Sequence, residues 1–110
     1  MSLVIIELTD KEMILAAGND LMNALQHADG ELYDNMRKRK GFKLYGIKRN
    51  DKYVGAFQVE SDRSITVCVG YQNKRFKANA DRDILLKIKS FIDDNNFTVN
   101  TDHLKELNDL

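Results

Sequence analysis

Apolar and polar positions alternate in two different periods along the chain, and the change of period separates strands from helices. Residues 3–8 form an apolar run rich in β-branched side chains, which predicts a strand. Over 10–28, apolar side chains recur three and four positions apart, which places them on one face of a helix. Thr9 and Glu12 have the spacing of a capping box at its start. Gly18 weakens the helix by about 1 kcal/mol relative to alanine and suggests a kink or a break.

The remaining pattern predicts a sheet followed by one strong helix. Polar turns separate three further strands, expected at 42–48, 53–59 and 64–69. Helices are expected at 31–39, at 80–95 and, over one or two turns, from Asp102, with a short edge strand at 97–99. Short turns between consecutive strands imply an antiparallel meander. We therefore predict one α+β domain over 1–110, a three- to four-stranded meander with two or three helices packed on one face.

Cys68 lies within the third of these strands. Ile65, Val67 and Val69 are expected on one face of it, with Thr66 and Cys68 on the other. A free cysteine in an apolar strand usually behaves as a small hydrophobe, so we interpret Cys68 as an inert thiol rather than a nucleophile. In the first meander strand the alternation slips near Gly46, which suggests a bulge or a close backbone approach.

Composition narrows the class of protein without naming a reaction. The chain has 110 residues, 43% of them hydrophobic and 31% charged, which is ordinary for one globular domain. Its single cysteine cannot form an internal disulfide, which favours a reducing cytoplasm. No apolar run approaches the roughly 20 residues of a membrane span. The first residues also lack the basic segment that opens a secretory leader.

Motifs for catalysis, metals and phosphate loops are missing from the sequence. No histidine or cysteine spacing typical of a metal site occurs, so we predict no metal. No serine-nucleophile motif and no glycine-rich phosphate loop occurs, so we predict no catalytic residue and no cofactor. His27, near the end of the first predicted helix, is interpreted as a capping or packing residue, with a general base as the alternative.

Charge is strongly segregated although the net charge is zero. Residues 1–36 hold one basic and seven acidic residues, residues 37–77 hold twelve basic and three acidic ones, and residues 78–110 hold four and seven. Basic side chains gain affinity for phosphate chains by releasing counterions, and aromatic rings stack on unpaired bases. The candidate binding residues are Arg37, Lys38, Arg39, Lys40, Lys74, Arg75 and Lys77 for charge, with Tyr71 and Phe76 for stacking. A solvated surface, or self-association of acidic with basic segments, would explain the same pattern.

Three stretches, in order, resemble the PcfJ-like proteins of phages and conjugative plasmids. Residues 25–33 are similar to that family's histidine-containing stretch, residues 53–60 to its strand pair, and residues 65–74 to its strand and polar loop. The resemblance implies a mobile-element context and a role close to nucleic acid. The residues that it singles out are His27, Gly30, Tyr33, Gly70 and Asn73.

A second resemblance concerns the central hairpin. Residues 44–57, with the pair Val54-Gly55, are similar to the middle strands of acetyltransferases of the GNAT type. That resemblance implies an acyl-CoA whose diphosphate is held by loop amides at a helix N-terminus. Gln72 fits the family's loop, but neither of the loop's glycines is present.

The sequence thus favours a small, non-enzymatic phage or mobile-element protein. We expect it to bind DNA, RNA or an acidic protein surface through the central basic segment, with no membrane as partner. A reduced acyl-CoA-dependent acetyltransferase and a self-associating interaction protein, such as a homo-oligomer, are the alternatives.

Overall fold

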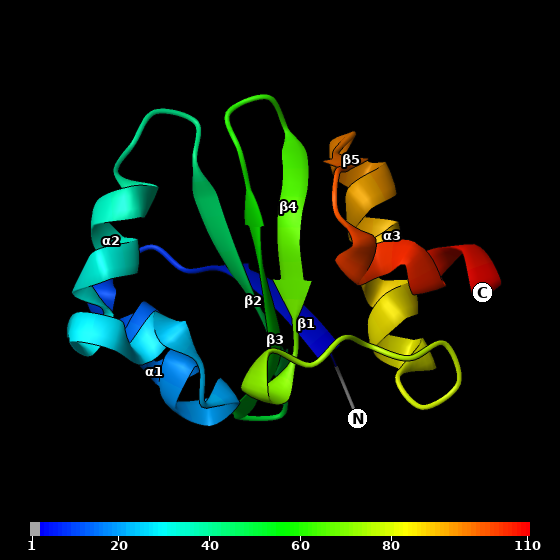
Figure 1. Cartoon of the computed structure of the whole chain (residues 1–110), viewed down its shortest axis with the longest axis horizontal. Helices are drawn as coiled ribbons and strands as arrows, with labels where there is room; N and C mark the ends of the chain where they lie inside the picture. The colour runs from blue at the N-terminus through cyan, green and yellow to red at the C-terminus, as the bar shows by residue number, and fades with distance from the viewer. Residues whose placement is uncertain (1–2) are drawn as a thin grey trace.

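The computed structural model describes residues 3–110, apart from the side chain of Ala28. A central sheet separates two groups of helices (Figure 1). The strands are β1 (Leu3–Glu7), β2 (Lys43–Arg49), β3 (Lys52–Val59), β4 (Ser64–Val69) and β5 (Thr98–Val99). The α-helices are α1 (Lys11–Leu21), α2 (Glu31–Arg37) and α3 (Arg82–Asn95), and the 3-10 segments are η1 (Ala24–Gly30), η2 (Tyr71–Asn73) and η3 (Asp102–Asp109). The α+β class is therefore confirmed.

The sheet has five strands in the order of the chain, whereas three or four were expected. The first four strands pair antiparallel, as the meander predicted. β5 lies parallel to β4 and pairs with only two of its residues, Ser64 with Thr98 and Ile65 with Val99. The helix α3 connects β4 to β5 and carries the chain back along the sheet. β5 can therefore run in the same direction as β4. Within residues 3–110, no strand pairs with the other four residues of β4 on their outer side.

Helices cover both faces of the sheet, so the expectation that they pack on one face is wrong. α1 packs on one face against a core that includes Leu44 and Ala56. α3 packs on the other face against Ile47 and Phe57. The reason lies in β2 and β3, where apolar side chains occupy positions of both parities, so both surfaces of the sheet must be buried. Within residues 3–110, no helix combines the length and the apolar character needed to cross a membrane.

The first helix is shorter than the predicted span of 10–28. α1 ends at Leu21, and Met22 adopts the left-handed conformation that ends it. The chain then folds back so closely that a Cβ on Gly18 would lie 2.3 Å from the backbone nitrogen of Gln26. Asp10, not Thr9, caps the helix, and its carboxylate accepts a hydrogen bond of 2.9 Å from the amide of Met13. The expected capping box is therefore wrong, because the helix starts one residue later.

β4 does not alternate cleanly. Its pairing with β3 shifts by one residue, so that Val67 faces Gln58 and Ile65 faces Val59. Thr66 is the extra residue of this bulge. Ile65 and Cys68 consequently lie in the core under α3, and the single-face set of Ile65, Val67 and Val69 is wrong. In β2 the expected irregularity is real but falls between Ile47 and Lys48, and Gly46 instead makes room for the ring of Tyr53.

Candidate functional site

A cavity of about 290 Å³ lies on the face of the sheet that carries α1 and α2, and it reaches the part of β4 that β5 does not pair. Its size is at the lower end of small-molecule sites. The walls come from the turn before η1 and from η1, α2, β2, β3, β4, η2 and η3. The lining residues are Asn23, Ala24, Leu25, Tyr33, Leu44, Ala56, Phe57, Gln58, Val67, Val69, Asn73 and His103.

The cavity is apolar with a few polar groups and no fixed charge. Among the residues that the structure describes, no aspartate, glutamate, lysine or arginine lines it. Only Tyr33 and His103 of its lining can exchange a proton. Such a surface suits a ligand that is neutral where it is enclosed, because an unpaired charge would lose its hydration there.

His103 closes the outer edge of β4. Its Nδ1 accepts a hydrogen bond of 3.2 Å from the backbone amide of Cys68. Thr101 fixes the start of η3 by accepting from the amide of His103 at 3.2 Å. Because Nδ1 is an acceptor, the neutral imidazole carries its proton on Nε2. His103 therefore accepts a hydrogen bond from the outward-facing backbone amide of Cys68. Its ring also lines the cavity, with Nε2–H as the donor that remains.

Cys68 itself faces the opposite core. Its side chain is fully buried with Tyr45, Phe57 and Ile88, and burial raises the pKa of the thiol. A thiol that does not ionise is a poor nucleophile. The structure thus supports the interpretation of Cys68 as a small hydrophobe.

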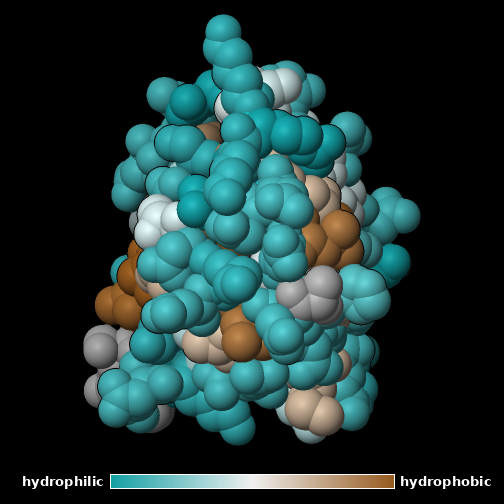
Figure 2. Space-filling model, turned by 90° about the vertical axis from the view of Figure 1, so that its left-hand side faces the viewer, coloured by the Kyte–Doolittle hydropathy of each residue, from teal (hydrophilic) through white to brown (hydrophobic). Residues whose placement is uncertain are grey.

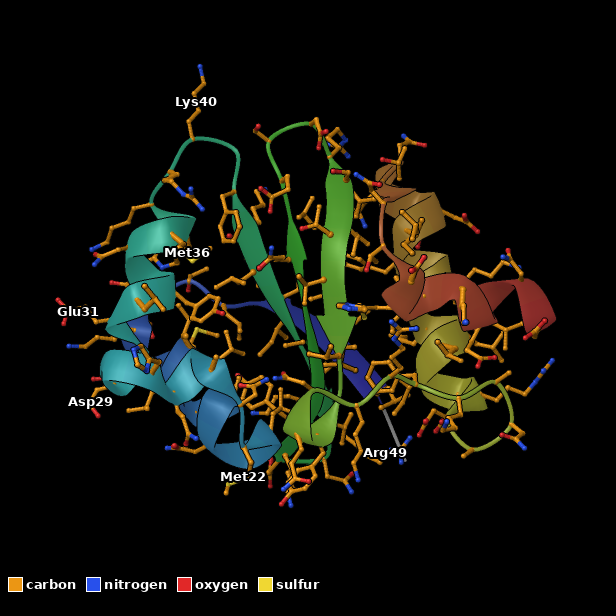
Figure 3. The ribbon with its side chains drawn as sticks, viewed as in Figure 1. Met22, Asp29, Glu31, Met36, Lys40 and Arg49 are labelled. Carbon is orange, nitrogen blue, oxygen red and sulfur yellow. The ribbon has the colours of Figure 1, made fainter. Side chains whose placement is uncertain are left out.

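The first basic cluster, Arg37 to Lys40, is largely engaged in local contacts. Arg37 pairs with the carboxylate of Asp34 at 2.7 Å and Lys38 pairs with it at 3.3 Å. The guanidinium of Arg39 lies over the ring of Phe42, 5.2 Å from its centroid. Lys40 points away from the body of the protein at the top of Figure 3. Three of the four basic side chains, Arg37, Lys38 and Arg39, thus make contacts at the end of α2.

The second basic cluster lies in the loop after β4, at the other end of the molecule from Arg37–Lys40 (Figure 1). Lys74, Arg75 and Lys77 are exposed, and Tyr71 is 49% exposed. Phe76 is only 4% exposed, because its ring packs against the backbone at Gly55 and Gly70. Its expected role as a stacking group is therefore wrong, and the ring anchors the loop to the core instead.

The residues singled out by the PcfJ-like resemblance divide into three groups. Tyr33 and Asn73 line the cavity. His27 is exposed on η1. Gly30 has a φ of 85°, and a Cβ there would meet the backbone of Lys11. Gly70 lies beside the ring of Phe76, so the backbone and packing explain the glycine at both positions. The resemblance itself stays a prediction.

Three polar side chains at the cavity, Asn23, Gln58 and His103, were not among the predicted site residues. Gln58 lies in one of the stretches similar to PcfJ-like proteins, Asn23 and His103 lie in none, and the three come from distant segments. Only the fold brings them together. Among residues 3–110, no three His, Cys, Asp or Glu side chains gather in a way that would hold a metal ion.

The side of the molecule that carries α1, η1 and α2 is mostly hydrophilic. Figure 2 looks onto this side and shows hydrophobic residues only as separated spots. Met22 and Leu32, at 53% and 44% exposure, are the large exposed apolar side chains of these segments. Isolated apolar residues of this kind are normal on a protein surface. This side therefore gives no sign of a second site.

Comparison with known proteins identifies a similar fold but no family. No protein-family model and no curated protein matches the sequence. The fold is similar to the crystal structure of a ribosomal-protein-alanine N-acetyltransferase from Brucella melitensis biovar Abortus 2308, with a TM-score of 0.58 and 12% identity. The match covers 96% of this chain and 84% of that one. At this identity the likeness concerns the fold alone.

Proposed function

We propose that the protein binds an acyl thioester of the coenzyme A type beside the outer edge of β4 and uses it in acyl transfer. The observation that carries this proposal is the cavity at the point where β5 leaves β4. The fold is similar to that of an N-acetyltransferase, and the central hairpin has the GNAT-like sequence. Together these favour the acetyltransferase alternative over the non-enzymatic one.

The loop after β4 fits the phosphates of such a ligand through its side chains. Asn73 lines the cavity, and the exposed Lys74, Arg75 and Lys77 follow it directly. Gln72 and Asn73 have φ values of 53° and 61°, so the chain turns there without the glycines of the GNAT loop. The amide of Lys77 donates to the carboxylate of Asp81 at 2.8 Å. Side-chain charge, rather than that amide, would therefore hold the phosphates.

The cavity supplies the groups for the transfer itself. In the transfer, the nucleophile of an acceptor substrate forms a bond to the acyl carbon of the thioester and the C–S bond breaks. Coenzyme A leaves as its thiol, with the proton that the acceptor gives up. His103 and Tyr33 are the lining residues that can hold or release a proton, and imidazole is the side chain most often used for this. The apolar walls around Val67 and Val69 exclude water from the acyl group.

Thermal unfolding in the presence of acetyl-CoA tests this proposal, and calorimetric titration gives the affinity of each variant. Ligand at about 100 times its dissociation constant should add about 2.7 kcal/mol to the free energy of unfolding, seen as a higher melting temperature. Charge reversal by Lys74→Glu with Lys77→Glu should weaken acetyl-CoA binding by about tenfold or more. Lys40→Glu with Lys43→Glu, an equal change of exposed charge on another segment, should leave it unaltered. No thermal shift with millimolar acetyl-CoA would contradict the proposal.

A second candidate function is the binding of nucleic acid, or of an acidic protein surface, by the same loop. The observation in its favour is that Tyr71 is exposed among Lys74, Arg75 and Lys77. Tyrosine rings stack on unpaired bases while the cations contact phosphates. It is also the function that a phage or mobile-element context favours.

A salt titration of oligonucleotide binding tests this second candidate. The logarithm of the affinity for a labelled single strand should fall linearly with the logarithm of the salt concentration. Lys74→Glu with Lys77→Glu should flatten that slope, as should reversal of Arg37–Lys40 if the first cluster also contacts phosphate. Absence of binding at low salt would remove this candidate. Association that disappears as salt rises, without oligonucleotide, would instead point to self-association.

A further inference from the structure

We infer that the cavity recognises a neutral amide group, and that Gln58, Asn23 and His103 are the residues that select it. The inference rests on the proposed function only in placing the ligand in this cavity, and it names the class of ligand group enclosed there. It is carried by hydrogen bonds that fix which end of each polar side chain remains available.

Gln58 offers an acceptor. Its Nε2 donates to the hydroxyl of Thr66 at 3.0 Å and to the carboxylate of Glu60 at 3.3 Å. The Thr66 hydroxyl in turn donates to the same carboxylate oxygen at 3.2 Å. A carboxylate only accepts, so the nitrogen of Gln58 must be the atom turned towards it. Both N–H groups are then used, and Oε1 remains to accept a hydrogen bond from a ligand.

The bulge in β4 makes this arrangement possible. Thr66 is the extra residue of the bulge, and its hydroxyl reaches both Gln58 and Glu60. A threonine in a regular register would not meet the same neighbours, because successive side chains of a strand point to opposite faces. Thr66 and Glu60 are therefore positioning residues for the Gln58 amide.

Asn23 and His103 offer donors. The Oδ1 of Asn23 accepts from the buried amide of Leu25 at 3.0 Å, so its NH2 group is the end left for the cavity. Within the described residues, no protein acceptor takes that NH2 group. His103 accepts through Nδ1 and so presents Nε2–H. These three side chains thus give the cavity one fixed acceptor and two donors, beside the Tyr33 hydroxyl and the Asn73 side-chain amide, neither of which is fixed by a hydrogen bond among the described residues.

An amide matches this set, because it carries one N–H donor and a carbonyl oxygen that accepts twice. An ammonium or a carboxylate would enter the cavity without an opposite charge, since no charged side chain lines it among residues 3–110. Enclosing an unpaired charge is far less favourable than enclosing a hydrogen-bonded amide. The arrangement therefore selects against charged analogues of the same size.

Titration with three small probes, followed by amide and side-chain NH2 signals in nitrogen-15 NMR, tests the inference. The probes are three molecules of the same size: acetamide, which is a neutral amide, acetate, which is anionic, and acetamidinium, which is cationic. We expect the neutral probe to bind at least about tenfold more tightly than either charged one. The largest shifts should fall on the side-chain NH2 groups of Asn23 and Gln58 and on the amide of Cys68.

Variants then separate recognition from general packing. Gln58→Leu removes the acceptor at similar volume and should weaken binding of the neutral probe about tenfold. Thr66→Val releases the Gln58 amide and should weaken it less. Gln26→Leu, at an exposed glutamine of η1, is the matched control and should change nothing. Equal binding of all three probes, or equal effects of Gln58→Leu and Gln26→Leu, would overturn the inference.

The same samples distinguish this inference from the proposed function. Acetyl-CoA binding without a preference for the neutral probe would overturn the inference and leave the proposed function standing. Preference for the neutral probe without acetyl-CoA binding would contradict the proposed function alone. The melting temperature of each variant shows whether it is folded.

Discussion

At the scale of single residues, Asp34 decides what the first basic cluster does. Burial by itself would raise the pKa of its carboxyl, but hydrogen bonds from Lys38 and Arg37 outweigh burial and hold the pKa below the ordinary 3.8. The two cations are thereby committed to the end of α2. A run of four basic residues in the sequence looks like one binding surface, yet two of them serve a neighbour three and four positions earlier.

Asp34 therefore gives a pH-dependent contribution to stability. Because the folded protein holds the carboxyl pKa below 3.8, the contribution is present above that value and is lost as the pH falls through the folded pKa. Denaturant unfolding at a series of pH values should show the wild type losing stability below about pH 4. Asp34→Asn should lack that component, whereas Asp93→Asn, at an exposed site on α3, should retain it. A wild-type loss that Asp34→Asn shares in full would disprove the assignment.

Some residue-scale features followed from the sequence and others did not. The burial of Cys68 followed, because the strand around it is apolar. Phe76 did not, because an aromatic ring among lysines and arginines looks exposed. Gly55 and Gly70 lack side chains, which leaves room for the Phe76 ring to pack against β3 and the end of β4. Nothing near Phe76 in the sequence indicates those glycines.

At the scale of elements, the strands were predicted well and the irregularity of β2 was placed nearly correctly, whereas the bulge of β4 was not predicted. β4 occupies the predicted residues 64–69, because turns and β-branched residues define it locally. Its bulge and its short parallel pairing with β5 depend on partners distant in the chain. The same holds for α1, whose apolar periodicity continues beyond the point where the chain folds back.

Gly18 tests that account of α1. A Cβ at this position would lie 2.3 Å from the nitrogen of Gln26 and 2.7 Å from the carbonyl carbon of Leu25, both in the backbone. Gly18→Ala should therefore destabilise the protein by about 1–3 kcal/mol, although alanine favours helices by about 1 kcal/mol. Ala16→Gly, at an exposed site in α1, should cost about 1 kcal/mol by helix propensity alone. Denaturant unfolding measures both, and a Gly18→Ala protein more stable than wild type would contradict the close approach.

At the scale of the whole molecule, the fold separates two basic clusters that the sequence places in one segment. It also brings polar residues from distant segments into one cavity. The two basic clusters lie at opposite ends, so the continuous basic segment of residues 37–77 is not one surface. Conversely, the turn before η1, β3 and η3 contribute Asn23, Gln58 and His103 to one cavity. Sequence patterns report neighbours along the chain, whereas this cavity is made by the order of the strands and the point where β5 departs.

An amide chemical-shift map of the whole protein with acetyl-CoA shows directly whether a thioester binds beside β4. We predict the largest changes along the outer edge of β4 and the loop after it, at Val67, Cys68, Asn73 and Lys74, and at His103. Residues 37–40 should be unaffected. Changes centred on residues 37–40, or no changes at saturating acetyl-CoA, would contradict a thioester site beside β4.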